Sequence, residues 1–368
     1  MHVLEAGFEE PDRPLVLLLH GFPDLCCGWR KIMVPLAAAG YHVIAPDQRG
    51  CGRTTGWDDA YVVDLGAFSL LTLARDALAL VEAFGYRSVA AVVGHDAGSP
   101  VAAWCALIRP DVFRAVVLMS VPFTGPPALP FDSANRSQAG AGSEDSANNM
   151  RTQLAELHPP RKFYQEYYRS REANDNLQHP PQGLHDFLWG YFYIKSADWK
   201  GNKPIALKNS SAAELAQIPR YYIMDQGKSM PETVAGLAPP RADIGATPWL
   251  TEAELDVYVS EWGRTGFQGA LNGYRVYVDP ALIAQLQLFA DRTIDVPSSF
   301  IAGKSDWAVY LTPGAVDVMR SRACTRMQEY ILLEGAGHWV QQEQSDAVCK
   351  ALLSFLRNNA DRSLRKTR

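Results

Sequence analysis

The sequence lacks the marks of several large classes of protein. No apolar run is long enough to cross a bilayer, and no basic region followed by an apolar run opens the chain, so no secretion signal is expected. Neither sign of charge dominates, because 35 Lys and Arg residues stand against 40 Asp and Glu residues, a formal net charge of −5. Without an extended basic stretch, nucleic acid is not an expected partner. These absences predict a soluble cytoplasmic protein with no membrane span.

Cysteine is scarce, and its spacing suggests no pairing. The chain has 6 cysteines, including adjacent Cys26 and Cys27, but no Cys-x-x-Cys pair and no spacing typical of a metal site. We therefore expect reduced thiols and no bound metal. Hydrophobic residues make up 47% of the 368 positions, which is enough for one large core with an inserted lid or for two modest domains.

The segment around which the chain is organised is residues 92–99, Val-Val-Gly-His-Asp-Ala-Gly-Ser. An apolar strand pattern precedes it and a helical pattern follows it. A small-x-nucleophile-x-small run between a strand and a helix is typical of the sharp nucleophile turn of α/β-hydrolases. Gly94 and Gly98 leave room for such a turn, and the residue at its apex is Asp96.

An aspartate at this apex limits the chemistry. A carboxylate is ionised at neutral pH without help from a base, and its attack on carbon leaves an ester joined to the enzyme. Asp96 suits a saturated, polarised carbon, as in a strained epoxide or an alkyl halide, whereas a serine would attack carbonyl carbon. Ser99 lies beyond the turn, so a serine esterase is not expected.

Strand and helix patterns alternate in the two end portions of the chain. Strands are predicted at residues 15–19, 41–45, 88–93, 114–119, 298–302 and 328–333. This alternation favours an α/β fold with a mostly parallel sheet covered on both faces.

The middle of the chain differs in composition from its ends. Residues 124–150 are rich in Gly, Pro, Ser, Ala and Asn and predict a flexible linker, and the aromatic patterns that follow are mostly helical, with long loops over 203–248. We expect an α/β-hydrolase core formed by residues 1–123 and 291–368, with a helical lid inserted over residues 124–290.

Asp96, Asp306 and His338 follow one another in the order nucleophile, acid, base of α/β-hydrolases. Asp306 follows a predicted strand and His338 lies in a glycine loop after the last strand, where parallel sheets build their sites. We expect His338 to be the general base for a water that attacks the ester, and Asp306 to orient its ring. Acids within predicted elements or before the glycine loop are weaker candidates: Asp317, Glu329 and Glu334.

Two backbone N–H groups are candidates for an oxyanion hole. One belongs to Phe22, in the His-Gly-Phe-Pro run that follows the first strong strand, and the other to Ala97. They would hold the ester carbonyl and the tetrahedral oxyanion. A cis peptide bond before Pro23 would direct Phe22 toward the site.

Four motifs together resemble those of the epoxide hydrolases of the α/β-hydrolase superfamily, and the similarity runs over nearly the whole chain. Residues 20–23 match His-Gly-Phe-Pro, 47–52 resemble Asp-x-Arg-Gly-x-Gly, 94–98 are similar to Gly-His-Asp-Trp-Gly, and 337–339 match Gly-His-Trp. The resemblance implies an enzyme that opens an epoxide to a vicinal diol through an aspartyl ester, with no cofactor. Its partners would be a small-molecule epoxide and water, and it would be a monomer or homodimer.

The resemblance also implies two lid tyrosines. Tyr164 stands in a segment similar to the family's Tyr-Gln-x-Tyr-Phe, and Tyr274 in one that resembles Asn-Trp-Tyr-Arg. Epoxide opening places negative charge on oxygen, and a phenol that is protonated at neutral pH can donate a hydrogen bond and then a proton to it. Neighbouring tyrosines compete with Tyr164 for this role.

Two positions depart from the family pattern. The tryptophans that follow the nucleophile and precede the second tyrosine are Ala97 and Gly273 in this chain. Because both changes remove an indole beside the expected site, we predict a pocket enlarged for a bulky or polycyclic substrate.

Two other functions stay open. A haloalkane or haloacid dehalogenase shares the aspartate nucleophile but holds its halide with N–H donors, commonly a tryptophan at the position of Ala97; halide release from fluoroacetate or chloroalkanes would reveal it. A hydrolase-fold protein that only binds a ligand would have lost catalysis, against a complete apparent nucleophile, acid and base. Ligand binding without turnover across a panel of epoxides would favour that alternative.

Overall fold

The computed structural model describes residues 1–131, 144–241 and 247–359, with the backbone alone for 144–149. Within these ranges one sheet is formed by β1 (Val3–Ala6), β2 (Leu15–Leu19), β3 (His42–Pro46), β4 (Ala91–His95), β5 (Val116–Met119), β8 (Ser298–Gly303) and β9 (Met327–Leu333). The spatial order is β1-β3-β2-β4-β5-β8-β9. The edge strand β1 is antiparallel to β3, and all other neighbours are parallel. The mostly parallel α/β sheet is thus confirmed.

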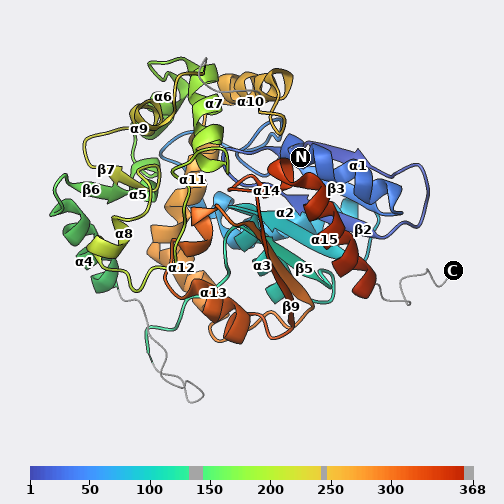
Figure 1. Cartoon of the computed structure of the whole chain (residues 1–368). Coiled ribbons are helices and arrows are strands. Elements are labelled where there is room, and N and C mark those ends of the chain that lie inside the picture. Colours follow the sequence, from blue (N-terminus) through green and yellow to red (C-terminus); the bar gives the residue numbers. More distant parts are fainter. Residues whose placement is uncertain (132–143, 242–246, 360–368) are drawn as a thin grey trace.

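Helices cover both faces of this sheet (Figure 1). On β2, Leu15, Leu17 and Leu19 pack in the same buried cluster as α2 (Leu70–Ala83) and α3 (Gly98–Ile108), while Val16 and Leu18 pack with α1 (Arg30–Ala38) and α15 (Ser345–Asn358). A strand buried on both faces explains why the sequence shows an unbroken apolar run there. Shorter elements of the core are η1 (Cys26–Trp29), η2 (Leu65–Phe68), η5 (Trp307–Tyr310), α13 (Ala315–Val318), η6 (Met319–Ala323) and α14 (Val340–Glu343).

A mostly helical insertion between β5 and β8 lies over one end of the sheet (Figure 1). Its elements are α4 (Glu144–Ala155), β6 (Arg161–Phe163), α5 (Tyr164–Tyr168), α6 (Ala173–Gln178), α7 (Leu184–Lys195), α8 (Ala212–Leu215), β7 (Ile223–Asp225), α9 (Met230–Leu237), α10 (Glu252–Thr265), α11 (Gln268–Arg275), η4 (Val276–Val278) and α12 (Pro280–Gln287). We refer to this insertion as the lid. None of the helices in the described ranges combines the length and the apolar character that crossing a bilayer requires.

The lid corrects two predictions of local structure. Residues 203–248 are not loops alone, because they contain α8, β7 and α9; a capping box of Ser229 and Glu232 starts α9, a signal that the proline-rich composition obscured. The linker predicted over 124–150 ends earlier, since α4 begins at Glu144, and its part over 132–143 lies outside the described residues. The capping box predicted at Thr251 is confirmed at the start of α10.

Buried hydrogen bonds join the lid to the loop that follows β2. In α10, the Tyr258 hydroxyl donates to Asp24 Oδ1 at 2.7 Å, and the Trp262 indole N–H donates to the Pro23 carbonyl at 2.8 Å. From the other side, the Trp339 indole N–H donates to the Phe192 carbonyl of α7 at 2.8 Å. These bonds hold the lid helices directly above the carboxyl ends of the parallel strands.

Candidate active site

Asp96 occupies the apex of a sharp turn between β4 and α3. Its backbone lies in the left-handed region, with φ of 51°, a conformation that a non-glycine residue adopts at a cost and that clusters at functional sites. The flanking glycines are required by close approach. A Cβ atom on Gly94 would lie 2.1 Å from the Gly98 carbonyl oxygen, and one on Gly98 would lie 2.3 Å from the Leu19 carbonyl oxygen. The strand–turn–helix prediction is confirmed.

The two carboxylate oxygens of Asp96 have different partners. The backbone N–H of Phe22 donates to Oδ1 at 2.9 Å, and Oδ2 lies 3.4 Å from His338 Nε2. The peptide bond between Phe22 and Pro23 is cis, as predicted. Ala97 directly follows Asp96 and is the N-cap of α3. The part of its N–H in an oxyanion hole stays a prediction.

His338 lies between Asp96 and Asp306 and is 1% exposed. Its Nδ1 lies 3.1 and 3.2 Å from the two carboxylate oxygens of Asp306. Asp306 is also 1% exposed and is fixed as an N-cap, since it accepts the backbone N–H of Ala308 at 2.9 Å. The other acids considered make no bond to His338 within the described residues: Asp317, Glu329 and Glu334.

Burial and charge oppose each other at these three groups. Burial acts to raise the pKa of Asp96, but the imidazole of His338, 3.4 Å away, and the charge of Lys195 outweigh burial and hold the pKa well below its usual range. Burial acts to lower the pKa of His338, but the Asp306 carboxylate raises it above its usual value. Asp96 is therefore ionised at neutral pH, beside an imidazole that readily holds a proton.

The two lid tyrosines predicted from the sequence come together above Asp96. Tyr164 opens α5 and Tyr274 lies in α11, and their ring centres are 6.1 Å apart. The Tyr274 ring also lies edge-on to Phe22, at 5.7 Å. Burial, with a smaller contribution from the Asp96 charge, raises the pKa of the Tyr164 phenol, and burial raises that of Tyr274 as well. Both phenols stay protonated and can donate hydrogen bonds.

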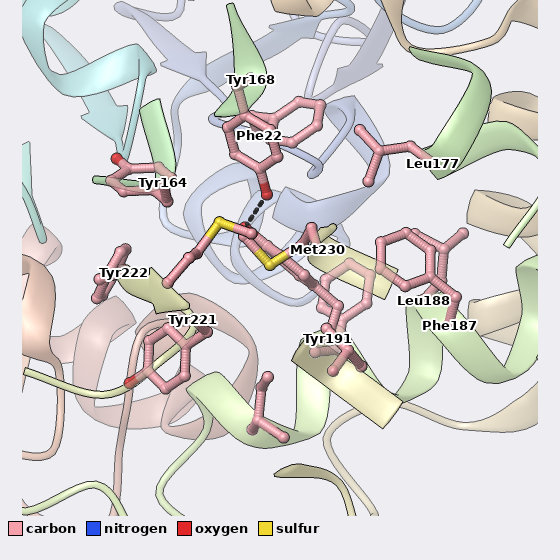
Figure 2. Close-up of a cluster of buried hydrophobic side chains, with 14 of the residues drawn as sticks. Phe22, Tyr164, Tyr168, Leu177, Phe187, Leu188, Tyr191, Tyr221, Tyr222 and Met230 are labelled. Atoms are coloured by element: carbon pink, nitrogen blue, oxygen red, sulfur yellow. Dashed lines mark hydrogen bonds between the residues drawn. The ribbon is translucent and has the colours of Figure 1, made fainter. Parts of the chain in front are cut away.

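These tyrosines belong to an aromatic cluster that continues through the lid (Figure 2). In Figure 2, Tyr164 and Tyr168 lie in the upper part of the view, and Tyr191, Tyr221 and Tyr222 lie below them. The Tyr168 hydroxyl donates to the Tyr191 hydroxyl at 3.1 Å, the bond drawn as a dashed line. Because the Tyr168 hydroxyl has this partner inside the cluster, packing accounts for Tyr168. The Tyr164 hydroxyl only accepts, from the side-chain amide of Gln165 at 3.3 Å, among the hydrogen bonds of the described residues, so its own proton stays available.

A largely apolar cavity of about 80 Å³ opens beside Asp96 on the side where the family pattern places two indoles. Ala97, Gly273, Tyr274 and Tyr277 contribute to its wall. A Cβ atom built on Gly273 would meet nothing within 4 Å. The space beside Gly273 is therefore not refilled by neighbouring side chains.

Two buried groups near His338 were not predicted from the sequence. Lys195, at the end of α7, has 3% exposure and accepts the His338 backbone N–H through its carbonyl at 2.9 Å. Glu343 accepts the backbone N–H groups of Ala197, Gly337 and Trp339 at 2.8, 2.9 and 3.0 Å, which fixes the His338 loop against the lid. Neither residue stands in a recognisable motif. The one available signal was the apolar run Tyr-Phe-Tyr-Ile that precedes Lys195, because a lysine at the end of a buried helix is itself buried.

Comparison with known proteins agrees with this geometry. Residues 14–179 match the family described as alpha/beta hydrolase fold. The chain is 32% identical to epoxide hydrolase A of Mycobacterium tuberculosis over 97% of this chain and 94% of that protein. It is also 32% identical to an epoxide hydrolase of Caballeronia sordidicola, over 97% and 90% of the two chains.

Solved structures give the same result. An epoxide hydrolase from an endophytic Streptomyces superposes with a TM-score of 0.73 at 30% identity, over 97% of this chain and 92% of that one. Epoxide hydrolase I of potato, Solanum tuberosum, superposes with a TM-score of 0.72 at 28% identity, over 97% and 95%. With its aspartate turn, its histidine and acid, and its lid, the chain belongs to the epoxide hydrolase family of the α/β-hydrolase fold.

Proposed function

We propose that the protein opens an epoxide to a vicinal diol through a covalent ester on Asp96. The observation that carries the proposal is the unequal pairing of the carboxylate oxygens. Phe22 N–H occupies Oδ1, so Oδ2, on the side of His338, is the oxygen available to attack. Relatives named epoxide hydrolases, which match over 97% of this chain and 90% or more of their own length, support this assignment.

In the first step, Asp96 Oδ2 forms a bond to one epoxide carbon and the bond from that carbon to the ring oxygen breaks. The electron pair of that bond stays on the ring oxygen, where Tyr164 and Tyr274 donate hydrogen bonds and one of them donates a proton. Two donors on one oxygen also aim the carbon at Asp96, which contributes through orientation. The products of the step are an ester and a free hydroxyl group.

In the second step, His338 Nε2 removes a proton from water and the resulting hydroxide adds to the Asp96 Cγ atom. The charge moves to Oδ1, where Phe22 N–H and Ala97 N–H stabilise it. Collapse of this tetrahedral oxyanion breaks the bond between Cγ and Oδ2, the His338 imidazolium gives its proton to the departing Oδ2, and the diol leaves with that original aspartate oxygen. The carboxylic acid that remains on Asp96 then returns its proton to His338. Asp306 stabilises the imidazolium formed on His338.

A single turnover in heavy-oxygen water tests this route. With enzyme in excess, the first diol is expected to carry no label, because both of its oxygens come from the epoxide and from Asp96, and the label enters the aspartate instead. Label in the first diol would show direct attack by water and end the proposal. Chloride and fluoride release from haloalkanes and fluoroacetate, measured alongside, is expected to be absent.

We also propose that the substrate carries a bulky apolar arm beside its epoxide. The cavity at Ala97 and Gly273 offers room next to Asp96, and a second apolar cavity of about 240 Å³ shares Leu70, Val276 and Tyr277 with it. A panel of epoxides with arms of increasing size tests this. We expect kcat/KM to rise with the apolar arm, and equal preference for small terminal epoxides would contradict it.

A further inference from the structure

The ammonium of Lys195 is enclosed by aromatic rings next to the catalytic groups. Its Nζ lies 4.5 Å from the ring centre of Tyr222 and 4.8 Å from that of Tyr191, with Tyr221 and Trp339 each at 5.9 Å. The residue is 3% exposed. These cation–π contacts replace part of the hydration that burial removes.

No hydrogen bond or ion pair joins this ammonium to another residue in the described parts of the chain. Buried lysines are rare, and most of them are paired with an acid, because an isolated buried charge is costly. Burial lowers the pKa of Lys195 to about 8, against the opposing charges of Asp96 and Asp306. A methionine would fill the same space without this cost, so folding alone does not explain the charge.

The backbone holds Lys195 in a fixed place relative to His338. Its carbonyl accepts the His338 N–H at 2.9 Å. On either side of it, the Asn202 side-chain amide donates to the carbonyls of Ile194 at 2.9 Å and Ser196 at 2.6 Å. These bonds fix the backbone of Lys195 beside His338, and the surrounding aromatic rings place its ammonium.

Four titratable groups surround the His338 ring, each from a different part of the fold. Asp306 follows β8, Asp96 follows β4, and Lys195 ends α7. His95, the last residue of β4, has its ring centre 5.0 Å from that of His338; burial lowers its pKa to about 4, so it carries no charge at neutral pH. The charges that face the His338 ring are thus those of Asp306, Asp96 and Lys195. Glu343 of α14 binds the backbone N–H groups of Gly337 and Trp339 instead, and burial raises its pKa to about 7.

We propose that Lys195 is a positioning residue whose ammonium keeps His338 unprotonated once Asp96 has become an ester, and so readies the imidazole to activate water. The inference rests on the proposed ester mechanism and extends it. Before ring opening, the carboxylates of Asp96 and Asp306 face Lys195. When His338 is protonated, the charges of Asp96, Asp306, Lys195 and His338 sum to zero. After ring opening, Asp96 is a neutral ester, and Lys195 alone balances Asp306.

The proton balance of the first step fits this role. Ring opening consumes one proton at the epoxide oxygen, supplied through a tyrosine, and a protonated His338 is the acid in the site that can replace it. The lysine keeps its own proton at pH 7, because its pKa of about 8 lies above that pH. Without the Lys195 charge, Asp306 would retain a proton on His338 in the ester state, and the base would be blocked.

Single-turnover kinetics of Lys195→Met across a range of pH test the inference, because methionine matches the length of the lysine stem. We expect ester formation to be nearly unchanged, ester breakdown at pH 7 to slow by about tenfold or more, and the apparent pKa of breakdown to rise by about one unit or more. The ester would then accumulate and appear in the intact mass of the protein. Lys195→Arg, which keeps the charge, is expected to restore the wild-type pH profile.

Lys162→Met is the matched control, since Lys162 lies over the Tyr167 ring at 5.4 Å in the lid but faces acids outside the site. It is expected to leave both rates unchanged. A Lys195→Met protein that breaks down its ester with the wild-type rate and pH profile would overturn the inference while leaving the ester mechanism intact. A wild-type protein that turns over epoxide with no ester at any pH would overturn both.

Discussion

The core and the lid contribute different chemistry to one site. In the proposed mechanism the core supplies the nucleophile Asp96, the base His338 and the acid Asp306 that orients it, each on a short loop after a parallel strand and each held by a backbone or side-chain hydrogen bond. The lid supplies phenols, rings and one buried ammonium, placed by packing between helices. The core therefore determines which reaction can occur, and the lid determines what fits and how the reacting oxygen is held. The predictions below test this division, starting with the largest expected effect.

Replacing the nucleophile removes the reaction that we assign to the core. In Asp96→Ala, diol formation is expected to fall by at least about 10⁴-fold, as when other single members of a catalytic set are lost. The assay follows diol by chromatography. Circular dichroism of the purified variant serves as the control for folding, and a folded variant with undiminished turnover would show that the core does not define the chemistry.

Removing one lid hydroxyl weakens the clamp on the epoxide oxygen without changing the nucleophile. Tyr274→Phe and Tyr164→Phe are each expected to slow ester formation by about 10²-fold, similar to the loss of one oxyanion donor. Tyr168→Phe is the matched control, because its hydroxyl already bonds to Tyr191, and it is expected to change the rate little. A larger effect from Tyr168→Phe than from Tyr164→Phe would show that Tyr168, and not Tyr164, is the second donor.

Filling the cavity changes selectivity rather than chemistry. In Gly273→Trp, kcat/KM for epoxides with a bulky arm is expected to fall by about tenfold, with small terminal epoxides nearly unaffected, since steric discrimination in a pocket is of this order. A Cβ atom at Gly236 of α9 also meets nothing within 4 Å. Gly236→Trp is therefore the control for an indole added to the lid away from this cavity, and it is expected to leave the selectivity unchanged. Equal losses for large and small substrates would contradict the assignment of this cavity.

The stability cost of the lid ammonium depends on pH. Burial lowers the Lys195 pKa to about 8 from an ordinary 10.5. Below about pH 8 the lysine is charged in both the folded and the unfolded state, and the charge has a higher free energy in the folded state. Between pH 8 and 10.5 the unfolded chain binds more protons, and stability rises with pH. We expect Lys195→Met to raise the free energy of unfolding at pH 7 by about 3 kcal/mol, with the gain shrinking toward pH 10.

Urea unfolding of the two proteins at pH 7 and pH 10 measures this difference. A constant gain at both values would show that packing, and not the charge, separates lysine from methionine at this position. The difference measures how much the Lys195 charge in the lid lowers the free energy of unfolding, which the carboxylate charges of Asp96 and Asp306 in the core are not expected to do.

Prediction from the sequence succeeded where a residue type is required locally. Six of the seven strands of the sheet and the turn at Asp96 were predicted, because alternating elements and close-packed glycines leave few other interpretations. The antiparallel edge strand β1 (Val3–Ala6) was not predicted, since its four residues are too short to show a pattern. Prediction was wrong at α9 and at the end of the linker, where polar and proline-rich composition hid real helix starts. Lys195 and Glu343 were missed because Lys195 gains its place in the site from His338 and Glu343 links the His338 loop to Ala197, and both contacts join segments that lie far apart along the chain.

The sequence by itself determined the identity of the nucleophile and the order of nucleophile, acid and base. The reason is local: only a glycine-flanked turn presents Asp96 in this way, and a carboxylate needs no further group to be ionised. The tertiary structure alone decided which tyrosine hydroxyls near Asp96 can still donate a hydrogen bond and which already donate one, and it placed beside His338 an ammonium that has no hydrogen bond or ion pair among the described residues. Those features depend on how lid helices pack over the strand ends, and packing between distant segments is not encoded in any short stretch.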